Sequence, residues 1–314
     1  MKAVVCTKYG PPEVLKIKDV PKPMPKDNEV LVKIHATTCH IGDVRIRSFN
    51  VPFWQMIPFR LFLGLTKPKK SILGMELAGE IDSVGQNVQK FKIGDQIFAT
   101  TGFEFGTYAE YRCFPEESTK IKKGMLLLMP SNMTYREAAA GVTTGGVTAL
   151  MILKKADIEQ GQKVLIYGAS GSVGSYAVQI AKYFGAKVTG VCSTGNIEMV
   201  KSLGADRVID YTKEDITQQE ATFDVVFDSV GKLRPSHGKK ILAKGGVFLN
   251  VMRDSGSGDT TTMEDLSFLR TLVEEEKLKA VIDRTYTLEQ IVEAHRYVED
   301  GHKKGHVVID VVSQ

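Results

Sequence analysis

Lys163-Val-Leu-Ile-Tyr167 runs directly into Gly168-Ala-Ser-Gly-Ser-Val-Gly174, and this junction indicates the fold of the chain. A short apolar run of this kind predicts a buried strand, and the small residues after it predict a tight turn. The helical pattern that follows at once predicts a helix N-terminus, whose free N–H groups and positive dipole end attract anions. The junction therefore indicates a phosphate-binding strand–turn–helix.

The spacing of small residues in this turn is typical of dinucleotide binding. Gly171 would let the backbone approach a pyrophosphate, and Gly174 would let the helix lie close to the strand, while Ala169 takes the first glycine position. The predicted cofactor contacts in the turn are Ala169, Ser170, Gly171, Ser172, Val173 and Gly174.

Further strands alternate with helices after the turn. Apolar runs at 187–192, 206–210, 223–228 and 246–251 predict four more strands, and the segments between them have helical patterns. Near-continuous apolar strands separated by helices predict a parallel sheet covered on both faces. We therefore expect an α/β domain of the Rossmann type with a doubly wound parallel sheet of five strands.

The first 120 residues have a different texture. Short strand candidates at 3–5, 30–34, 77–81, 96–99 and 108–111 are separated by Gly, Pro, Asn and Asp. This pattern predicts a compact and mostly antiparallel β domain. The sequence thus divides into residues 1–120 as a substrate domain, 121–276 as the nucleotide-binding domain, and 277–314 as a return to the substrate domain.

Composition narrows the function classes. The 41 basic and 37 acidic residues are mixed along the chain, so nothing indicates nucleic-acid binding. Four scattered cysteines favour a reducing compartment. The N-terminus enters a strand at once, and no apolar run is long enough to span a membrane. We expect a cytoplasmic protein.

Many short motifs, spread over nearly the whole chain, resemble one family. They include Gly74-Met-Glu-Leu-Ala-Gly79, Phe91-Lys-Ile-Gly-Asp95, Gly106-Thr-Tyr-Ala-Glu-Tyr111 and Leu203-Gly-Ala-Asp206. The chain resembles the zinc-independent, quinone oxidoreductase-like branch of the medium-chain dehydrogenase/reductase family. The resemblance implies a GroES-like β domain, a Rossmann domain and NAD(P)H-dependent reduction of quinones or α,β-unsaturated carbonyls.

The resemblance also bears on metal binding. Zinc-dependent relatives have a histidine where this chain has Met75, and a thioether is a poor zinc ligand. Their cluster of four closely spaced cysteines has no counterpart here. We expect no metal. A zinc-dependent alcohol dehydrogenase remains one alternative, and a nucleotide-binding or membrane-surface protein with little turnover is another.

NADPH is favoured over NADH as the cofactor. An acid at the end of the second strand would hold the ribose hydroxyl of NADH, and this strand instead ends at Cys192-Ser-Thr194. The resemblance places Ser193 and Tyr211 at the 2′-phosphate of NADPH. Thr148 is a further expected cofactor contact by resemblance, and Gly231 and Asn250 lie at the carboxyl ends of predicted strands, where ligands bind in open sheets.

Catalytic and substrate residues are less well marked. His40 is the best catalytic candidate, either as a hydrogen-bond donor to a developing oxyanion or as a proton source near neutral pH, with water as an equal contender. Asp43 is expected to be structural, and His306, where relatives have lysine, a surface substitution. The predicted substrate pocket, for a small hydrophobic quinone or enone, is His40, Phe49, Phe53, Trp54 and Phe62.

The segment from Phe49 to Leu65 is rich in large apolar side chains and is followed by lysines. We weigh three interpretations: an apolar lid over the substrate, a membrane-surface patch, and ordinary core, with the lid favoured.

The Ser255–Gly258 stretch replaces a region that often builds the dimer in relatives, so a monomer is slightly favoured over a homodimer.

Overall fold

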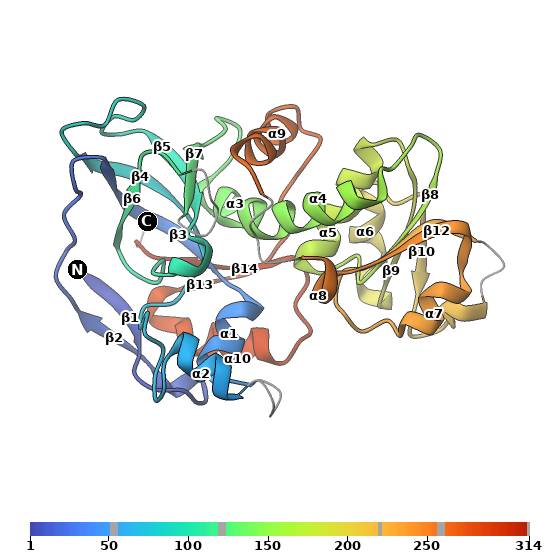
Figure 1. Cartoon of the computed structure of the whole chain (residues 1–314), viewed down its shortest axis with the longest axis horizontal. Helices are drawn as coiled ribbons and strands as arrows, with labels where there is room; N and C mark the ends of the chain where they lie inside the picture. Colours follow the sequence, from blue (N-terminus) through green and yellow to red (C-terminus); the bar gives the residue numbers. More distant parts are fainter. Residues whose placement is uncertain (51–55, 119–123, 219–221, 256–260, 313–314) are drawn as a thin grey trace. The chain divides into compact units, whose positions relative to one another are not determined.

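The computed structural model describes residues 1–50, 56–118, 124–218, 222–255 and 261–312. The chain forms two compact units, one made of residues 1–143 and 282–314 and the other of residues 144–281. The sequence-based boundary at 120 differs because β7 (Met125–Leu128) pairs with β5 (Gln96–Thr100), and this pairing holds it in the first unit. Figure 1 follows the chain by colour.

The second unit is built on a five-stranded parallel sheet. Its strands are β8 (Lys163–Tyr167), β9 (Lys187–Cys192), β10 (Arg207–Asp210), β11 (Phe223–Asp228) and β12 (Leu242–Asn250), in the order β10-β9-β8-β11-β12. Its helices are α4 (Val147–Leu153), α5 (Ser172–Tyr183), α6 (Ile197–Ser202), α7 (Pro235–Lys240), α8 (Val251–Asp254) and α9 (Met263–Glu274). This strand order is that of one doubly wound nucleotide-binding half with two added strands. The expected fold class is confirmed.

The core of this sheet comes from strands whose residues are apolar on both faces. Leu165, Val191, Ile209 and Val226 are fully buried at the centres of four adjacent strands. Burial on both faces is what a parallel sheet between helices requires. β12 begins four residues before the expected position, because Leu242 already pairs with Phe223 across an irregularity in the ladder.

The first unit is a β structure that both ends of the chain complete. Its main sheet has the order β13-β14-β3-β4-β5-β7, and β6 also pairs with β3. The remaining strands are β1 (Lys2–Cys6), β2 (Leu15–Asp19), β3 (Glu29–Cys39), β4 (Glu76–Val84), β6 (Tyr111–Pro115), β13 (Ile282–Thr287) and β14 (His306–Asp310). The helices are α1 (Ile41–Ser48), α2 (Met56–Leu63), α3 (Tyr135–Ala139) and α10 (Ile291–Glu299).

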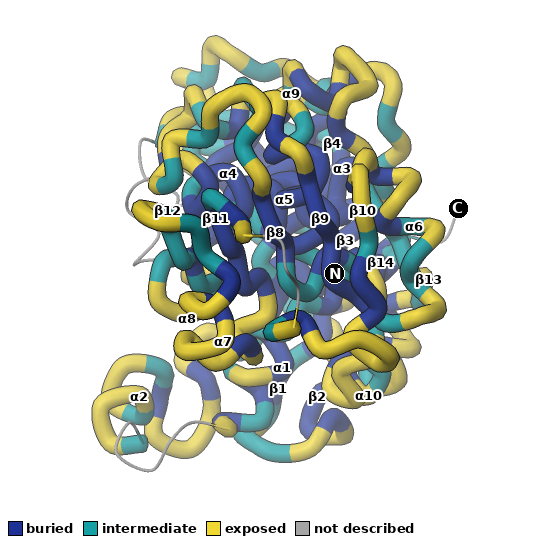
Figure 2. The backbone as a smooth tube through the Cα atoms, turned by 90° about the vertical axis from the view of Figure 1, so that its right-hand side faces the viewer, coloured by how far each residue is buried: buried dark blue, intermediate teal, exposed yellow. Residues whose placement is uncertain are grey.

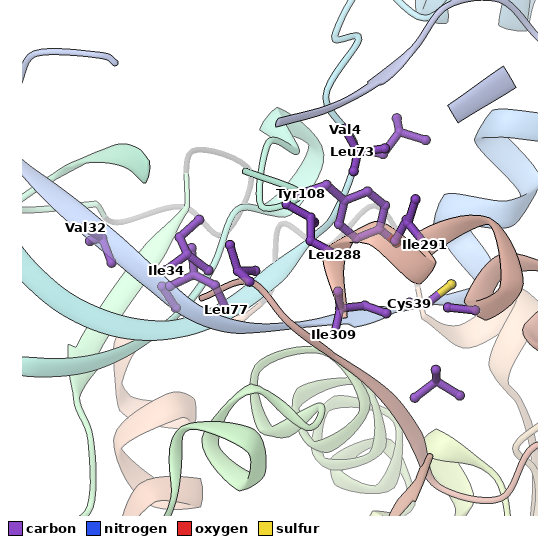
Figure 3. Close-up of a cluster of buried hydrophobic side chains, with 14 of the residues drawn as sticks. Val4, Val32, Ile34, Cys39, Leu73, Leu77, Tyr108, Leu288, Ile291 and Ile309 are labelled. Atoms are coloured by element: carbon purple, nitrogen blue, oxygen red, sulfur yellow. The ribbon is translucent and has the colours of Figure 1, made fainter. Parts of the chain in front are cut away.

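The core of the first unit joins segments that lie far apart in sequence. Figure 3 shows Val4, Leu73, Tyr108, Leu288 and Ile291 in one cluster of buried side chains, so β1 and the region of α10 share a core. The antiparallel pairing of β14 with β3 closes the return of the C-terminal segment. Tyr108 is fully buried just before β6, although the sequence places a strand at 108–111.

His306 lies inside this unit, and the expectation of a surface substitution is wrong. Its side chain is 2% exposed at the start of β14. The ring stands against Gly141, whose φ is +83°, and a Cβ at Gly141 would lie 1.9 Å from His306 Nε2. The position is internal because β14 is covered on both faces, which the sequence of a five-residue terminal strand does not reveal.

Candidate functional site

The turn between β8 and α5 has the geometry that its glycines predict. At Gly174 a Cβ would lie 2.1 Å from the Gly168 carbonyl oxygen, so only glycine lets α5 approach the turn. At Gly171 a Cβ would have only ordinary contacts, the nearest at 3.4 Å from the Gly168 carbonyl oxygen, so packing within the protein does not require glycine here. The left-handed residue of the turn is Gly168, with φ +80°. Ala169 faces inward and is fully buried.

The N-terminus of α5 directly follows this turn and begins without a side-chain cap from the described residues. Gly171 is its N-cap residue. Ser170, Ser172 and Val173 are half-buried. Uncapped N–H groups and the positive dipole end make this a suitable site for a pyrophosphate.

The carboxyl ends of β9 and β10 lie beside the turn. The Asn196 side-chain amide donates to Ser193 Oγ at 3.1 Å and to Ser170 Oγ at 3.3 Å, so it ties the end of β9 to the turn. Sequence reasoning missed Asn196, which follows the Ser193-Thr-Gly195 loop. Tyr211 is 53% exposed, and its N–H donates to the Cys192 carbonyl oxygen.

One acidic residue, Asp210, lies near the predicted 2′-phosphate position, where a free carboxylate would disfavour NADPH. It ends β10, not β9, and is 4% exposed. Its carboxylate accepts hydrogen bonds from the Thr194 and Thr212 hydroxyls and from the Thr212 N–H, and these bonds lower the pKa of Asp210. Both carboxylate oxygens of Asp210 therefore already accept hydrogen bonds from neighbouring residues.

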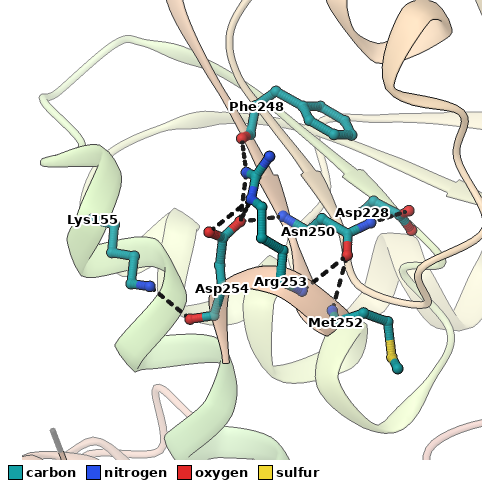
Figure 4. A network of polar contacts seen from close by, with 7 residues as sticks. All are labelled: Lys155, Asp228, Phe248, Asn250, Met252, Arg253 and Asp254. Carbon is teal, nitrogen blue, oxygen red and sulfur yellow. Dashed lines mark hydrogen bonds and ion pairs between the residues drawn. The ribbon is translucent and has the colours of Figure 1, made fainter. Parts of the chain in front are cut away.

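Asp228 organises the loop that contains Gly231, and Figure 4 shows its hydrogen bond with Asn250. The carboxylate is fully buried and accepts from the N–H groups of Val230, Gly231 and Leu233. Asn250 Nδ2 donates to Asp228 Oδ2 at 2.9 Å. Gly231 has φ +73°, and a Cβ there would lie 2.6 Å from Met252 Cγ, so this position requires glycine.

Asn250 forms hydrogen bonds within this loop through Nδ2, Oδ1 and its backbone N–H. While Nδ2 donates to Asp228, Oδ1 accepts from the Met252 and Arg253 N–H groups and caps α8. The Asp254 carboxylate accepts from the Asn250 N–H, and Lys155 Nζ donates to the Asp254 carbonyl oxygen. The structure therefore gives Asn250 a role in holding the loop. Thr148 lies in α4 and is half-buried.

In the first unit, His40 caps α1. The Gly42 N–H donates to His40 Nδ1 at 3.0 Å, and the His40 N–H donates to Asp43 Oδ2 at 3.1 Å, which completes a capping box. A backbone N–H can only donate, so Nδ1 is the acceptor and the proton of the neutral imidazole sits on Nε2. Burial, aided by the positive charges of Lys303 and Arg45, lowers the pKa of His40 to about 4. The ring is thus neutral near pH 7.

Asp43 is buried beneath His40 and has a structural role there. Its Oδ1 accepts from the Gly74 N–H at 3.0 Å, while Oδ2 holds the His40 N–H. Burial raises the pKa of Asp43 to about 6, against the effect of these two hydrogen bonds. Tyr108 is fully buried nearby and its hydroxyl lies 3.3 Å from His295 Nε2.

Lys303 adds a positive charge near His40, and Glu76 acts on Lys303; sequence reasoning connected neither residue with His40. Glu76 is 1% exposed, and its Oε1 accepts from the Thr38 hydroxyl at 2.5 Å. Burial lowers the pKa of Lys303 to about 8, although Cys39, Asp283 and Glu76 raise it. The only sequence signal is a lysine pair between Gly301 and Gly305, which resembles any solvated loop.

Two of the predicted pocket residues, Phe49 and Phe62, have different environments: Phe49 is buried and Phe62 is exposed. Phe49 is 8% exposed, and its ring centroid lies 4.6 Å from that of Tyr9 and 4.8 Å from the Arg60 guanidinium carbon. Phe62 is 68% exposed on α2. Phe53 and Trp54 lie outside the described residues. No residue of α2 is buried, so the interpretation of this helix as ordinary core is wrong.

The described residues do not fit a zinc ion. Among the described residues, no three His, Cys, Asp or Glu side chains gather closely enough to hold a metal. His40 Nδ1 already accepts a backbone hydrogen bond, and burial strongly raises the pKa of the neighbouring Cys39 thiol. The raised pKa disfavours the thiolate form that binds zinc.

Comparison with known proteins places the chain in a family. Residues 26–124 match the alcohol dehydrogenase GroES-like domain, and residues 172–294 match the zinc-binding dehydrogenase domain. The chain is 35% identical to 2-methylene-furan-3-one reductase of Solanum lycopersicum, over 98% of this chain and 79% of that protein. It is 30% identical to the chloroplastic NADPH-dependent alkenal/one oxidoreductase of Arabidopsis thaliana, with the same coverage. The structure of the quinone oxidoreductase from Coxiella burnetii matches with a TM-score of 0.84 and 30% identity, over 99% of both chains.

The fold and these similarities define a medium-chain dehydrogenase/reductase, a nicotinamide-dependent oxidoreductase. Within this family the chain belongs to the quinone oxidoreductase-like branch, as the sequence motifs predicted.

Proposed function

We propose that this protein is a zinc-free reductase that uses NADPH to reduce quinones or α,β-unsaturated carbonyl compounds. The observation that carries the proposal is the N-terminus of α5, which has no side-chain cap among the described residues and follows a glycine turn, and which suits a pyrophosphate. Relatives named for alkenal/one, furanone and quinone reduction support the choice of acceptor.

The proposed cofactor site uses residues of the second unit. The N–H groups of Ser172, Val173 and Gly174 would bind the pyrophosphate, with Ser170 at its edge. Ser193 and Tyr211, at the ends of β9 and β10, would bind the 2′-phosphate. Thr148 and Gly231 would contact the cofactor directly, whereas Ala169 and Asn250 would support the backbone that does so.

NADPH is the proposed choice because β9 ends without a carboxylate. Cys192, Ser193 and Thr194 follow one another at this point, and an acid there would repel a 2′-phosphate. The nearby Asp210 carboxylate is engaged by two threonines. Lys201 forms an ion pair with Glu198 one turn earlier in α6, at 3.0 Å, and is not assigned to the phosphate.

His40 is the proposed catalytic residue of the first unit. A bound reduced nicotinamide would supply a hydride to the acceptor, and negative charge would then develop on the acceptor oxygen. Because Gly42 fixes Nδ1 as an acceptor, His40 presents Nε2–H, and a hydrogen bond from this group would stabilise that charge. The positive charge of Lys303, which already acts on His40, would favour the same charge. The proton itself would come from water.

The test is NADPH consumption by metal-stripped protein with aryl quinones and alkyl enones, measured in parallel with NADH. We expect acceptor-dependent oxidation that is faster with NADPH and insensitive to chelators. Tight NADPH binding without turnover on any acceptor would contradict the proposal and favour a nucleotide-binding protein. Activity that appears only after zinc is restored would indicate an alcohol dehydrogenase instead.

A further inference from the structure

Helix α2 exposes apolar side chains to a degree that is unusual for a surface helix. Ile57, Leu61 and Phe62 are 75%, 64% and 68% exposed, and Leu65 just after the helix is 63% exposed. Figure 2 colours α2 as exposed or intermediate along its described length. Soluble proteins rarely expose contiguous apolar surface unless it binds something.

The helix is also turned the opposite way from an ordinary amphipathic surface helix. At about 100° per residue, its three half-buried residues, Met56, Arg60 and Leu63, fall within roughly 60° of its circumference. The other five residues cover roughly 200° of the circumference, and all of them are apolar and exposed. These five are Ile57, Pro58, Phe59, Leu61 and Phe62.

The one charged residue of α2 therefore faces the protein. The Arg60 guanidinium lies over the Phe49 ring, and Nη1 donates to the Leu65 carbonyl oxygen. Arg60 holds α2 in this orientation through contacts to the protein, and the apolar side remains outside. An ordinary amphipathic surface helix would turn its apolar side chains toward the protein and its charged side chain toward water.

The charge around α2 is entirely positive in sequence. Residues 44–75 contain six Arg or Lys and no Asp or Glu, so the rest of the chain has 35 basic and 37 acidic residues. Lys67, Lys69 and Lys70 follow the helix directly and are exposed. Lys70 pairs with Glu104, and Lys69 Nζ donates to the Leu61 carbonyl oxygen.

We propose that the outer face of α2, with Lys67 and Lys69 beside it, binds the surface of an anionic lipid bilayer. An apolar helical face bordered by cations is the arrangement that inserts at the level of lipid headgroups. A second copy of this chain fits less well, because pairing the two α2 faces would bring two sets of lysines together. The contact is peripheral: no helix among the described residues is long and apolar enough to cross a membrane.

The test is co-sedimentation of the full protein with phosphatidylcholine vesicles and with vesicles in which roughly one third of the lipid is phosphatidylglycerol. Wild-type protein should bind the anionic vesicles more tightly, and binding should fall as salt is raised. The I57S/L61S/F62S variant should lose about ten-fold or more in vesicle affinity. K67E/K69E should lose only the preference for anionic lipid.

A matched control removes exposed apolar side chains elsewhere in the same unit. Met24 and Ile93 are 86% and 65% exposed, so M24S/I93S should bind vesicles as wild type does. The α2 variant should unfold at the wild-type temperature, because it loses no buried contact. Vesicle binding that survives in the α2 variant would overturn the proposal. So would a dimer, seen by sedimentation velocity, that dissociates in this variant. The measurement needs neither cofactor nor acceptor, so its failure is distinct from failure of the proposed reductase.

Discussion

At the residue scale, Gly171 and Gly174 serve different physical purposes although they share one motif. Gly174 is required by the protein, since a Cβ would meet the Gly168 carbonyl oxygen at 2.1 Å. Gly171 is not, since its Cβ would have ordinary contacts. Because packing within the protein does not require glycine at this position, we attribute Gly171 to the approach of the cofactor.

Substitution separates these two purposes. Gly174→Ala should lower the free energy of unfolding by about 1–3 kcal/mol through overpacking. Gly171→Ala should leave stability close to wild type and weaken NADPH binding about ten-fold or more, because the methyl group occupies space meant for the pyrophosphate. Thermal unfolding and fluorescence titration with NADPH measure the two effects. Equal loss of NADPH affinity without loss of stability in both variants would contradict this division.

His40 shows how a single hydrogen bond selects a chemical role. The Gly42 N–H fixes the tautomer, and burial with nearby positive charge lowers the pKa of the ring to about 4. Of the two roles that the sequence allows, these observations favour the hydrogen-bond donor over the acid that titrates near neutral pH.

The variant His40→Asn tests this role, because asparagine is a good N-cap and preserves the helix start but lacks Nε2–H. We expect kcat to fall by about 10²-fold or more, the typical cost of one oxyanion donor, with NADPH affinity unchanged. The pH profile of kcat for the wild-type protein should show no inflection near pH 6.5. An inflection there that disappears in His40→Asn would show that His40 titrates during turnover.

At the scale of elements, the C-terminal return is tied to α1 by an ion pair whose cation, Arg47, is buried and whose anion, Glu299, is partly exposed. The Arg47 side chain has no exposed surface, and its Nη2 lies 2.7 Å from Glu299 Oε2 on α10. Nη1 also donates to the Gly10 carbonyl oxygen. A cation buried this fully depends on its partners, because water cannot replace them.

Glu299→Gln should therefore destabilise the protein by about 1–3 kcal/mol, less than for a fully buried pair because Glu299 is 44% exposed. The matched control is Glu13→Gln, which breaks the pair with Arg296 on the same helix. Both partners there are about half exposed, so this substitution should cost clearly less stability than Glu299→Gln. Urea unfolding compares the two, and equal costs would show that burial of Arg47 does not matter.

At the scale of the whole molecule, buried titratable groups set the response to acid. Burial lowers the pKa of His295 to about 3 and that of His40 to about 4. Between these values and 6.5, the unfolded chain binds more protons than the folded one, so stability falls as pH falls. Burial raises the pKa of Asp43 to about 6, so this group acts in the opposite direction between about pH 6 and 4.

The two histidines outweigh the single carboxyl, so we expect the free energy of unfolding to decrease from pH 6.5 to 4. Each pKa unit corresponds to about 1.4 kcal/mol, so the combined change is on the order of several kcal/mol. His295→Gln removes one titrating group and should flatten this dependence. Urea unfolding at successive pH values checks the slope, and an unchanged slope in His295→Gln would refute the assignment.

Sequence alone determined the features that depend on local pattern. The parallel strands, the Gly168–Gly174 turn and the family motifs are readable because burial on both faces, tight turns and helix starts each restrict nearby residues. The same reasoning correctly expected five strands in the parallel sheet.

Tertiary structure decided what depends on contacts between distant residues. Three examples are the burial of His306, the effect of the Lys303 charge on His40, and the hydrogen bond between Asn250 and Asp228. The partners in these contacts lie from about 20 to more than 260 residues apart in the sequence. α2 is the clearest case. Its sequence is apolar enough for a core, yet the protein holds its Arg60 side and leaves the apolar side outside, and only packing determines which side of a helix is covered.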